Sequence, residues 1–133
     1  MNVAKAIRAR LIANTSATYT QVGTRIYPGR LPDGATLPAI MYKRRKGGVQ
    51  HIYNIDQTID HTRAPFEIHC YAGEESYDKA TAAAEAVIAD LEAFRQAYDD
   101  MTIHAVFIND QSDVYDGTNK RQCVTVDIEV WYN

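Results

Sequence analysis

The chain has 133 residues and a formal net charge of −3 at pH 7, with 46% hydrophobic and 23% charged residues. This length predicts one domain, residues 1–133, with a core large enough to fold without disulfides or metals. The mildly acidic charge argues against a general nucleic-acid binder, which would be strongly basic. No apolar run approaches the ~20 residues of a membrane span, and the N-terminal residues lack the apolar segment typical of a signal peptide.

The first predicted element is a helix that begins after Asn2, a residue type that caps helices well. Val3, Ile7 and Leu11 recur every four residues and form one apolar stripe. The helix is expected to end in the sequence "NTSAT", where Asn, Thr and Ser side chains compete for backbone hydrogen bonds.

Residues 17–38 are expected to form a long loop rich in glycine and proline. A phosphate-binding loop would lead into a helix N-terminus and usually end in Gly-Lys-Ser/Thr. This segment instead leads into "LPAIMYKRRK", where Pro38 favours an extended chain and residues 40–46 are typical of a strand. The segment is therefore interpreted as a shaped connector.

Residues 47–63 are expected to form an extended arm or a projecting hairpin. Gly47 and Gly48 open the segment, and its isoleucines are interleaved with polar residues over a length greater than a turn needs. A second strand follows in "APFEIHCYA", where Phe66, Ile68 and Cys70 alternate with polar or aromatic residues.

A second helix is expected from Tyr77 to about Tyr98, because apolar residues advance there in steps of three and four. "MTIHAVFIN" predicts a third strand, and residues 110–120 predict a turn-rich crossing with its tip at Asp116-Gly117. "QCVTVDIEVWY" predicts the fourth strand, since its valines and Ile128 alternate with Thr, Asp and Glu.

The predicted order is helix, strand, strand, helix, strand, strand. Short links between strands favour antiparallel pairing, and a sheet with one apolar face needs helices to cover that face. The expected fold class is therefore α+β: a two-layer sandwich of a four-stranded, mainly antiparallel sheet with two helices on one face. Trp131, near the end of the last strand, either packs on its own domain or anchors a partner.

No enzymatic motif emerges from the sequence. Cys70 and Cys123 are expected to be reduced core thiols. A zinc or iron site would have to draw on residues whose spacing matches no HxH or HExxH pattern: His51, Asp56, Asp60, His61 and His69. The cationic run "KRRK" at 43–46 fits a solvated strand end or an interface to an acidic neighbour better than a nucleic-acid site. We therefore expect no catalytic residues, no metal and no cofactor.

Three segments together resemble a known family. They are "VGTRIYPGRLPDGATLPAIMYKR", "FEIHCYAGEESYDKATAAAEAVIADL" and "RQCVTVDIEVWY". With the short helix before them, they resemble the small tail-completion proteins of long-tailed bacteriophages, also described as tail-terminator or tail-to-head joining proteins. The resemblance covers most of the chain, and residues 47–63 match least well.

The resemblance implies a structural protein without catalytic activity. Such proteins form a ring, commonly of six copies, that stops the tail tube from growing and offers a surface to the neck of the filled head. The implied partners are further copies of the chain, the tail tube protein and a head-completion or neck protein, with no membrane and no specific nucleic acid. The implied location is the host bacterial cytoplasm during assembly and then the virion tail, of an active phage or a prophage.

The loop and the arm are the segments expected to contact other subunits. The candidate interface residues are Arg25, Tyr27, Arg30, Lys43, Arg45, His51, Tyr53, Asp56 and Trp131. Two alternatives stay open. One is another head-tail connector or neck protein, and the other is a small metal-dependent hydrolase.

Overall fold

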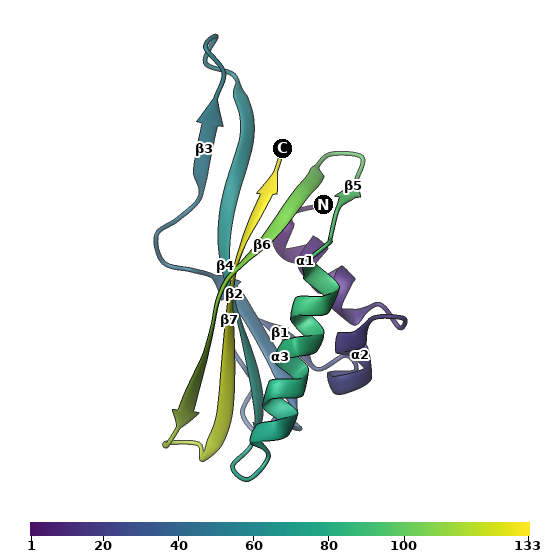
Figure 1. Ribbon diagram of the computed structural model, residues 1–133, viewed down its shortest axis with the longest axis vertical. Helices are drawn as coiled ribbons and strands as arrows, with labels where there is room; N and C mark the ends of the chain where they lie inside the picture. Colours follow the sequence, from purple (N-terminus) through teal and green to yellow (C-terminus); the bar gives the residue numbers. More distant parts are fainter.

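The structure, a computed structural model, describes all residues from 1 to 133 and contains three helices and a seven-stranded mixed sheet (Figure 1). The helices are α1 (Val3–Ile12), α2 (Ala17–Val22) and α3 (Tyr77–Leu91). The strands are β1 (Ile26–Pro28), β2 (Ala39–Arg44), β3 (Gln50–Tyr53), β4 (Ile59–Gly73), β5 (Gln96–Ala97), β6 (Thr102–Asp116) and β7 (Arg121–Tyr132).

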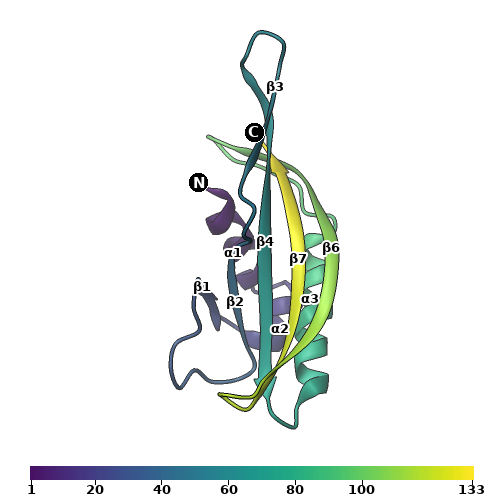
Figure 2. The ribbon, with the colours of Figure 1, turned by 90° about the vertical axis from the view of Figure 1, so that its left-hand side faces the viewer.

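The predicted fold class is wrong. The molecule is mostly sheet, curled into a half-barrel, and is not a four-stranded sandwich with two helices. The strands follow the order β1-β2-β4-β7-β6-β5, and β3 pairs with β4 off this path. Only β1 and β2 are parallel, and every other pair is antiparallel. Figure 2 shows β2 and β6 on opposite sides of the sheet, with β4 and β7 between them.

The sequence missed elements that carry a weak apolar signal. Residues 17–38, expected as a loop, contain the short helix α2 and strand β1. Residues 110–116, expected as a crossing, are the second half of β6. This half of β6 is exposed, so its polar side chains meet no apolar layer that would impose a two-residue alternation. The sequence of an exposed strand therefore resembles the sequence of a loop.

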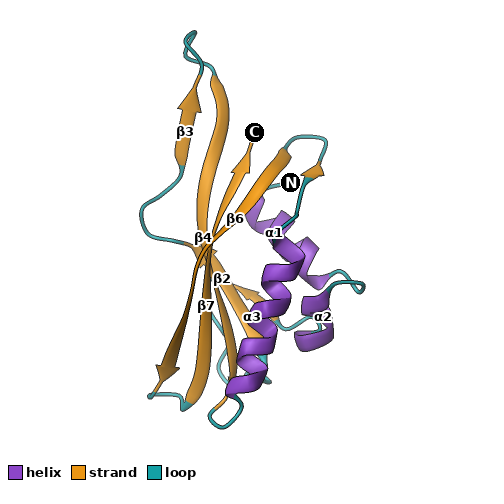
Figure 3. Ribbon diagram, viewed as in Figure 1, coloured by secondary structure: helices purple, strands orange, loops and turns teal.

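The core lies between the sheet and the helices, which all cover one face (Figure 3). In β4, Phe66, Ile68 and Cys70 point into the core, while their neighbours in the strand are half-buried. The helix α3 presents small residues to the sheet, and Ala80 and Ala84 have no exposed surface. Small side chains let the helix backbone approach the sheet closely.

A buried carboxylate joins two helices. Asp90, near the end of α3, is 8% exposed. Its carboxylate oxygens accept hydrogen bonds from the backbone N–H groups of Ala17 (3.1 Å) and Thr18 (2.8 Å) at the start of α2. Ser16 caps the same helix by accepting from the N–H of Tyr19 at 3.0 Å. These bonds satisfy N–H groups that a helix start leaves without intrahelical partners.

Both cysteines are free and buried. Cys70 faces Val124 in the ladder between β4 and β7, whereas Cys123 faces Tyr71. Adjacent residues of a strand point to opposite faces, so the two thiols lie on opposite sides of the sheet. Burial raises the pKa of the Cys70 thiol well above its ordinary value. Burial raises the pKa of the Cys123 thiol as well.

Candidate interaction surfaces

The first surface is the hairpin arm, which we define as residues 47–63. β3 pairs with the first residues of β4, and the turn between them closes on itself. The Asp56 carboxylate accepts hydrogen bonds from the Thr58 hydroxyl (2.6 Å) and the Thr58 N–H (3.0 Å). These bonds hold the pKa of Asp56 below its ordinary value. The turn is therefore shaped by its own residues and needs no support from the core.

The arm carries apolar side chains into solvent. Tyr53 is 59% exposed, Ile55 104% and Ile59 50%. Figure 1 shows the arm extending past the helices and past the rest of the sheet. Single exposed apolar residues are normal on protein surfaces, whereas a cluster on a projecting element marks an interaction site.

The second surface is the sheet face that the helices leave uncovered. Several of its charges are paired within the chain. Lys43 lies 4.0 Å from Glu67, and Arg45 lies 3.5 Å from Asp127. His69 contacts the same Glu67 at 2.9 Å. Exposed ion pairs of this kind contribute only ~0–1 kcal/mol each to stability, so they balance the charge of the face more than they hold it together.

Trp131 packs on its own domain. Its ring stacks on His61 with 4.8 Å between ring centroids and meets the edge of Phe107 at 5.6 Å. The Arg63 guanidinium lies 5.2 Å from the ring centroid, and the indole N–H donates to Glu129 at 2.6 Å. Of the two roles expected for Trp131, the structure shows the packing role.

The structure separates the nine candidate interface residues into three groups. Arg25 and Tyr27 lie beside or in β1, and Arg30 follows that strand and pairs with Asp33 at 3.6 Å. The Arg25 side chain donates to the Pro38 carbonyl at 2.8 Å, so part of its role is to hold the connector. The uncovered face carries Lys43, Arg45 and Trp131, and the hairpin arm carries His51, Tyr53 and Asp56.

The third surface is the outer edge of β6, which the sequence did not reveal. β5 pairs only with Thr102 and Ile103, so the edge from His104 to Asp116 has no neighbouring strand. Phe107, Val114 and Tyr115 are about half-exposed along this strand. Residues 102–116 contain neither proline nor lysine, two residue types that often block open sheet edges. The absence of both residue types is the sequence feature that could have indicated an open edge here.

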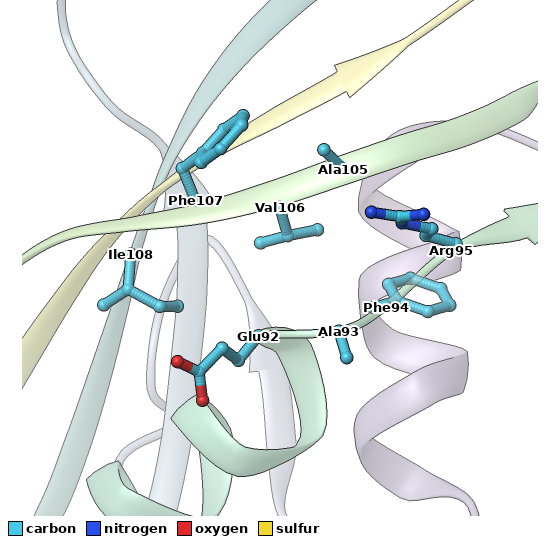
Figure 4. Close-up of a pocket in the computed structure, with 8 residues that line it drawn as sticks. All are labelled: Glu92, Ala93, Phe94, Arg95, Ala105, Val106, Phe107 and Ile108. Carbon is cyan, nitrogen blue, oxygen red and sulfur yellow. The ribbon is translucent and has the colours of Figure 1, made fainter.

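An apolar pocket of about 600 Å³ lies beside this edge, between β6 and the segment that follows α3. Figure 4 shows Val106 and Ile108 pointing toward that segment, whereas Phe107 points to the other side of β6. Phe94 also lines the pocket, and Arg95 belongs to its lining. The pocket is thus a mainly apolar hollow whose lining also includes one cation, Arg95, and one carboxylate, Glu92.

The histidines have local partners, and His61 and His104 line one hollow together with Asp60. His51 contacts the Thr62 hydroxyl at 3.0 Å, and His61 contacts Asp60 at 2.9 Å. No group of three or more His, Cys, Asp or Glu side chains is placed to hold a metal ion. None of the helices has the length and apolar character that would let it span a membrane.

Comparison with known proteins agrees with this description. The structure is similar to a chain in the virion of a native gene transfer agent particle, with a TM-score of 0.78 over 98% of this chain and 93% of that chain. The two are 15% identical in sequence, so this likeness concerns the fold. No curated protein sequence matches the chain. The family model described as tail completion protein gp17 matches residues 5–133. The resemblance found in the sequence is therefore confirmed, and the chain belongs to the gp17 family of tail completion proteins, structural components of phage tails.

Proposed function

We propose that this protein ends the tail tube as a ring of identical copies, six when assembled, and joins the tail to the head. Its partners in this proposal are further copies of the chain, the tail tube protein and a head-completion or neck protein. Assembly takes place in the host bacterial cytoplasm, and the product is part of the virion tail. The protein catalyses no reaction in this role.

The observation that carries the proposal is the hairpin arm. An apolar tip on a self-contained turn, far from the core, contributes little to the stability of its own domain. A contact between unlike surfaces of identical subunits closes into a ring when the rotation between neighbours suits closure. The hairpin arm offers one such surface. The uncovered face of the sheet and the outer edge of β6 offer two others.

The length of the tail tube tests the proposal. Electron microscopy of tails assembled without this protein should show overlong tubes, because nothing would stop tube growth. Tubes of normal length would contradict the terminator role and favour the alternative, a different connector or neck protein. Tails assembled with the protein restored serve as the control.

The arm can be tested separately by removing it. A chain in which residues 50–60 are replaced by two glycines keeps Val49, which packs against the core, and His61, which stacks on Trp131. We expect this variant to fold and to lose ring formation, as measured by light scattering. A truncated chain that still formed the full oligomer would show that the arm is not a subunit contact.

Point variants refine this test. Replacing Tyr53 and Ile55 together by serine removes the apolar tip and keeps the hairpin backbone. We expect this double variant to weaken ring formation as the truncation does. Tyr19→Ser is the matched control, because Tyr19 is a partly exposed apolar residue on α2, away from the arm. Its ring formation should equal that of the unaltered chain.

A further inference from the structure

The two long edges of the sheet carry opposite charge. On one side of the sheet, β1 covers only Ile40–Tyr42 of β2, so an open edge runs from Lys43 through β3 to Tyr53, and we call it the β2–β3 edge. It begins with the cationic run 43–46, all Lys or Arg. The outer edge of β6 carries Asp110, Asp113 and Asp116. We infer that in the assembled ring the β6 edge of one copy docks on the β2–β3 edge of the next copy. This inference names the contact surfaces of the proposed ring and so rests on the proposed function.

Some of these charges have no partner within the chain. Arg44, Lys46 and Asp110 are exposed and form no ion pair. The other acids of the β6 edge have local contacts: Asp113 accepts from the Tyr77 hydroxyl, and Asp116 pairs with Arg121 at 3.0 Å. The unpaired cations and the unpaired carboxylate therefore lie on opposite edges of the same sheet.

The strand directions suit the contact. β2 and β3 run antiparallel to β4, β4 runs antiparallel to β7, and β7 runs antiparallel to β6. β2 and β3 therefore run opposite to β6. Copies related by rotation about an axis inclined to the strands, as strands are inclined in a barrel, keep nearly the same orientation. The two edges would then meet as an antiparallel pair that is staggered along the strands. Such a pair can form a hydrogen-bonded ladder.

A single displacement brings two sets of complementary groups together. Through the observed ladders, Lys43 is level with Asp110, and Gln50 is level with Ala105. Sliding the neighbour along the strands by about five residues, or ~16 Å at ~3.3 Å per residue, sets its cationic run opposite residues 112–115. The same displacement sets its Tyr53 opposite Val106, so its apolar arm tip reaches the pocket beside β6.

The charges also determine which edges can pair. Two β6 edges would bring aspartates together, and two β2–β3 edges would bring lysines and arginines together. Like charges across an interface disfavour both of these contacts. Only the acidic edge with the basic edge remains favourable, and this pairing propagates from copy to copy in one direction around a ring.

Zero-length crosslinking tests the contact directly. A carbodiimide joins a lysine to a carboxylate only where the two side chains touch. Within one chain, Lys46 and Asp110 lie near opposite edges of the sheet, and only links of mixed isotope count as contacts between chains. The experiment treats a concentrated equal mixture of ¹⁴N- and ¹⁵N-labelled chains and identifies linked peptides by mass spectrometry. We expect peptides of mixed isotope that join Lys46 to Asp110 or Asp113.

Mixed-isotope links that omit these pairs would overturn the inference, and so would a chain that yields no mixed-isotope links at high concentration. Charge exchange adds a second readout. Lys46→Glu and Asp110→Lys should each weaken association at least about tenfold, because each sets like charges against each other, and the double variant should recover it. Lys79→Glu and Glu85→Lys are matched controls at exposed positions of α3, and they should change nothing.

The crosslinking experiment and the tail-length experiment can contradict their two hypotheses independently of each other. Tubes of normal length together with the Lys46–Asp110 link would refute the terminator role and leave the edge contact standing. Overlong tubes together with mixed-isotope links elsewhere would support the terminator role and refute this interface.

Discussion

At the scale of single residues, one buried carboxylate couples the small helix α2 to the main helix. Asp90 accepts two backbone hydrogen bonds from the start of α2, and Arg10 of α1 donates to the Asp90 carbonyl at 2.9 Å. Three helices therefore meet at this residue. Because α2 is only six residues long, it depends on such contacts more than on its own helix propensity.

The role of Asp90 gives a quantitative prediction. Asp90→Ala should lower the free energy of unfolding by about 1–3 kcal/mol, because the buried N–H of Thr18 and the partly buried N–H of Ala17 lose their acceptor. Asp90→Asn keeps one acceptor oxygen and should lower it less. Urea unfolding curves measure both changes. Glu85→Ala, an exposed substitution on the same helix, should change the free energy by less than about 0.5 kcal/mol, and an equal loss in that variant would contradict the capping role.

At the scale of elements, the contact of α3 with the sheet depends on small side chains. Ala84→Leu adds three carbon atoms at a position with no exposed surface. We expect a loss of about 1–3 kcal/mol in the free energy of unfolding, because the helix must move away from the sheet. Ala89→Leu, on the exposed side of the same helix, is the control. Calorimetry that found the two variants equally stable would mean that the helix does not pack closely.

The elements predictable from the sequence are those whose burial imposes a period. Val124, Val126 and Ile128 face the core from β7, and this alternation identified the strand. The stripe of α1 identified the first helix in the same way. The polar half of β6 has no buried face, and β1 has only three residues. Neither strand therefore shows the alternation of apolar and polar residues from which a strand can be predicted. Local sequence therefore predicted the covered part of the sheet and missed its edges.

The same reasoning applies to the interaction surfaces. The hairpin arm was predictable because two glycines and interleaved isoleucines mark an extended excursion of the chain. The open edge of β6 was not, because an edge exists only once the strand order is known. The grouping of Lys43, Arg45 and Trp131 on one face follows from the alternation of β2 and β7 and from the ladders between them and β4.

At the scale of the whole molecule, ring formation should be visible in thermal stability. Association stabilises the folded state by mass action, by about 2.7 kcal/mol when the concentration is about one hundred times the dissociation constant. We therefore expect the Tm to rise with protein concentration, as measured by scanning calorimetry. The chain in which residues 50–60 are replaced should show a Tm that does not depend on concentration.

A Tm independent of concentration in the unaltered chain, over about a hundredfold range, would contradict self-association in solution. Added salt provides a further comparison. Charges on the sheet edges are screened more strongly as ionic strength rises, because the Debye length falls from ~10 Å at 0.1 M to ~3 Å at 1 M. The concentration dependence should therefore weaken in high salt if the charged edges carry the contact.

The hairpin arm has a consequence for how such proteins diverge. Its turn is closed by Asp56 and Thr58, and its tip makes no contribution to the core. Mutations at the tip should therefore change the stability of the fold very little. Related proteins can then evolve arms that bind a different partner surface while the core stays the same. Transplanting the arm between relatives should transfer compatibility with a foreign tail while the recipient scaffold stays intact.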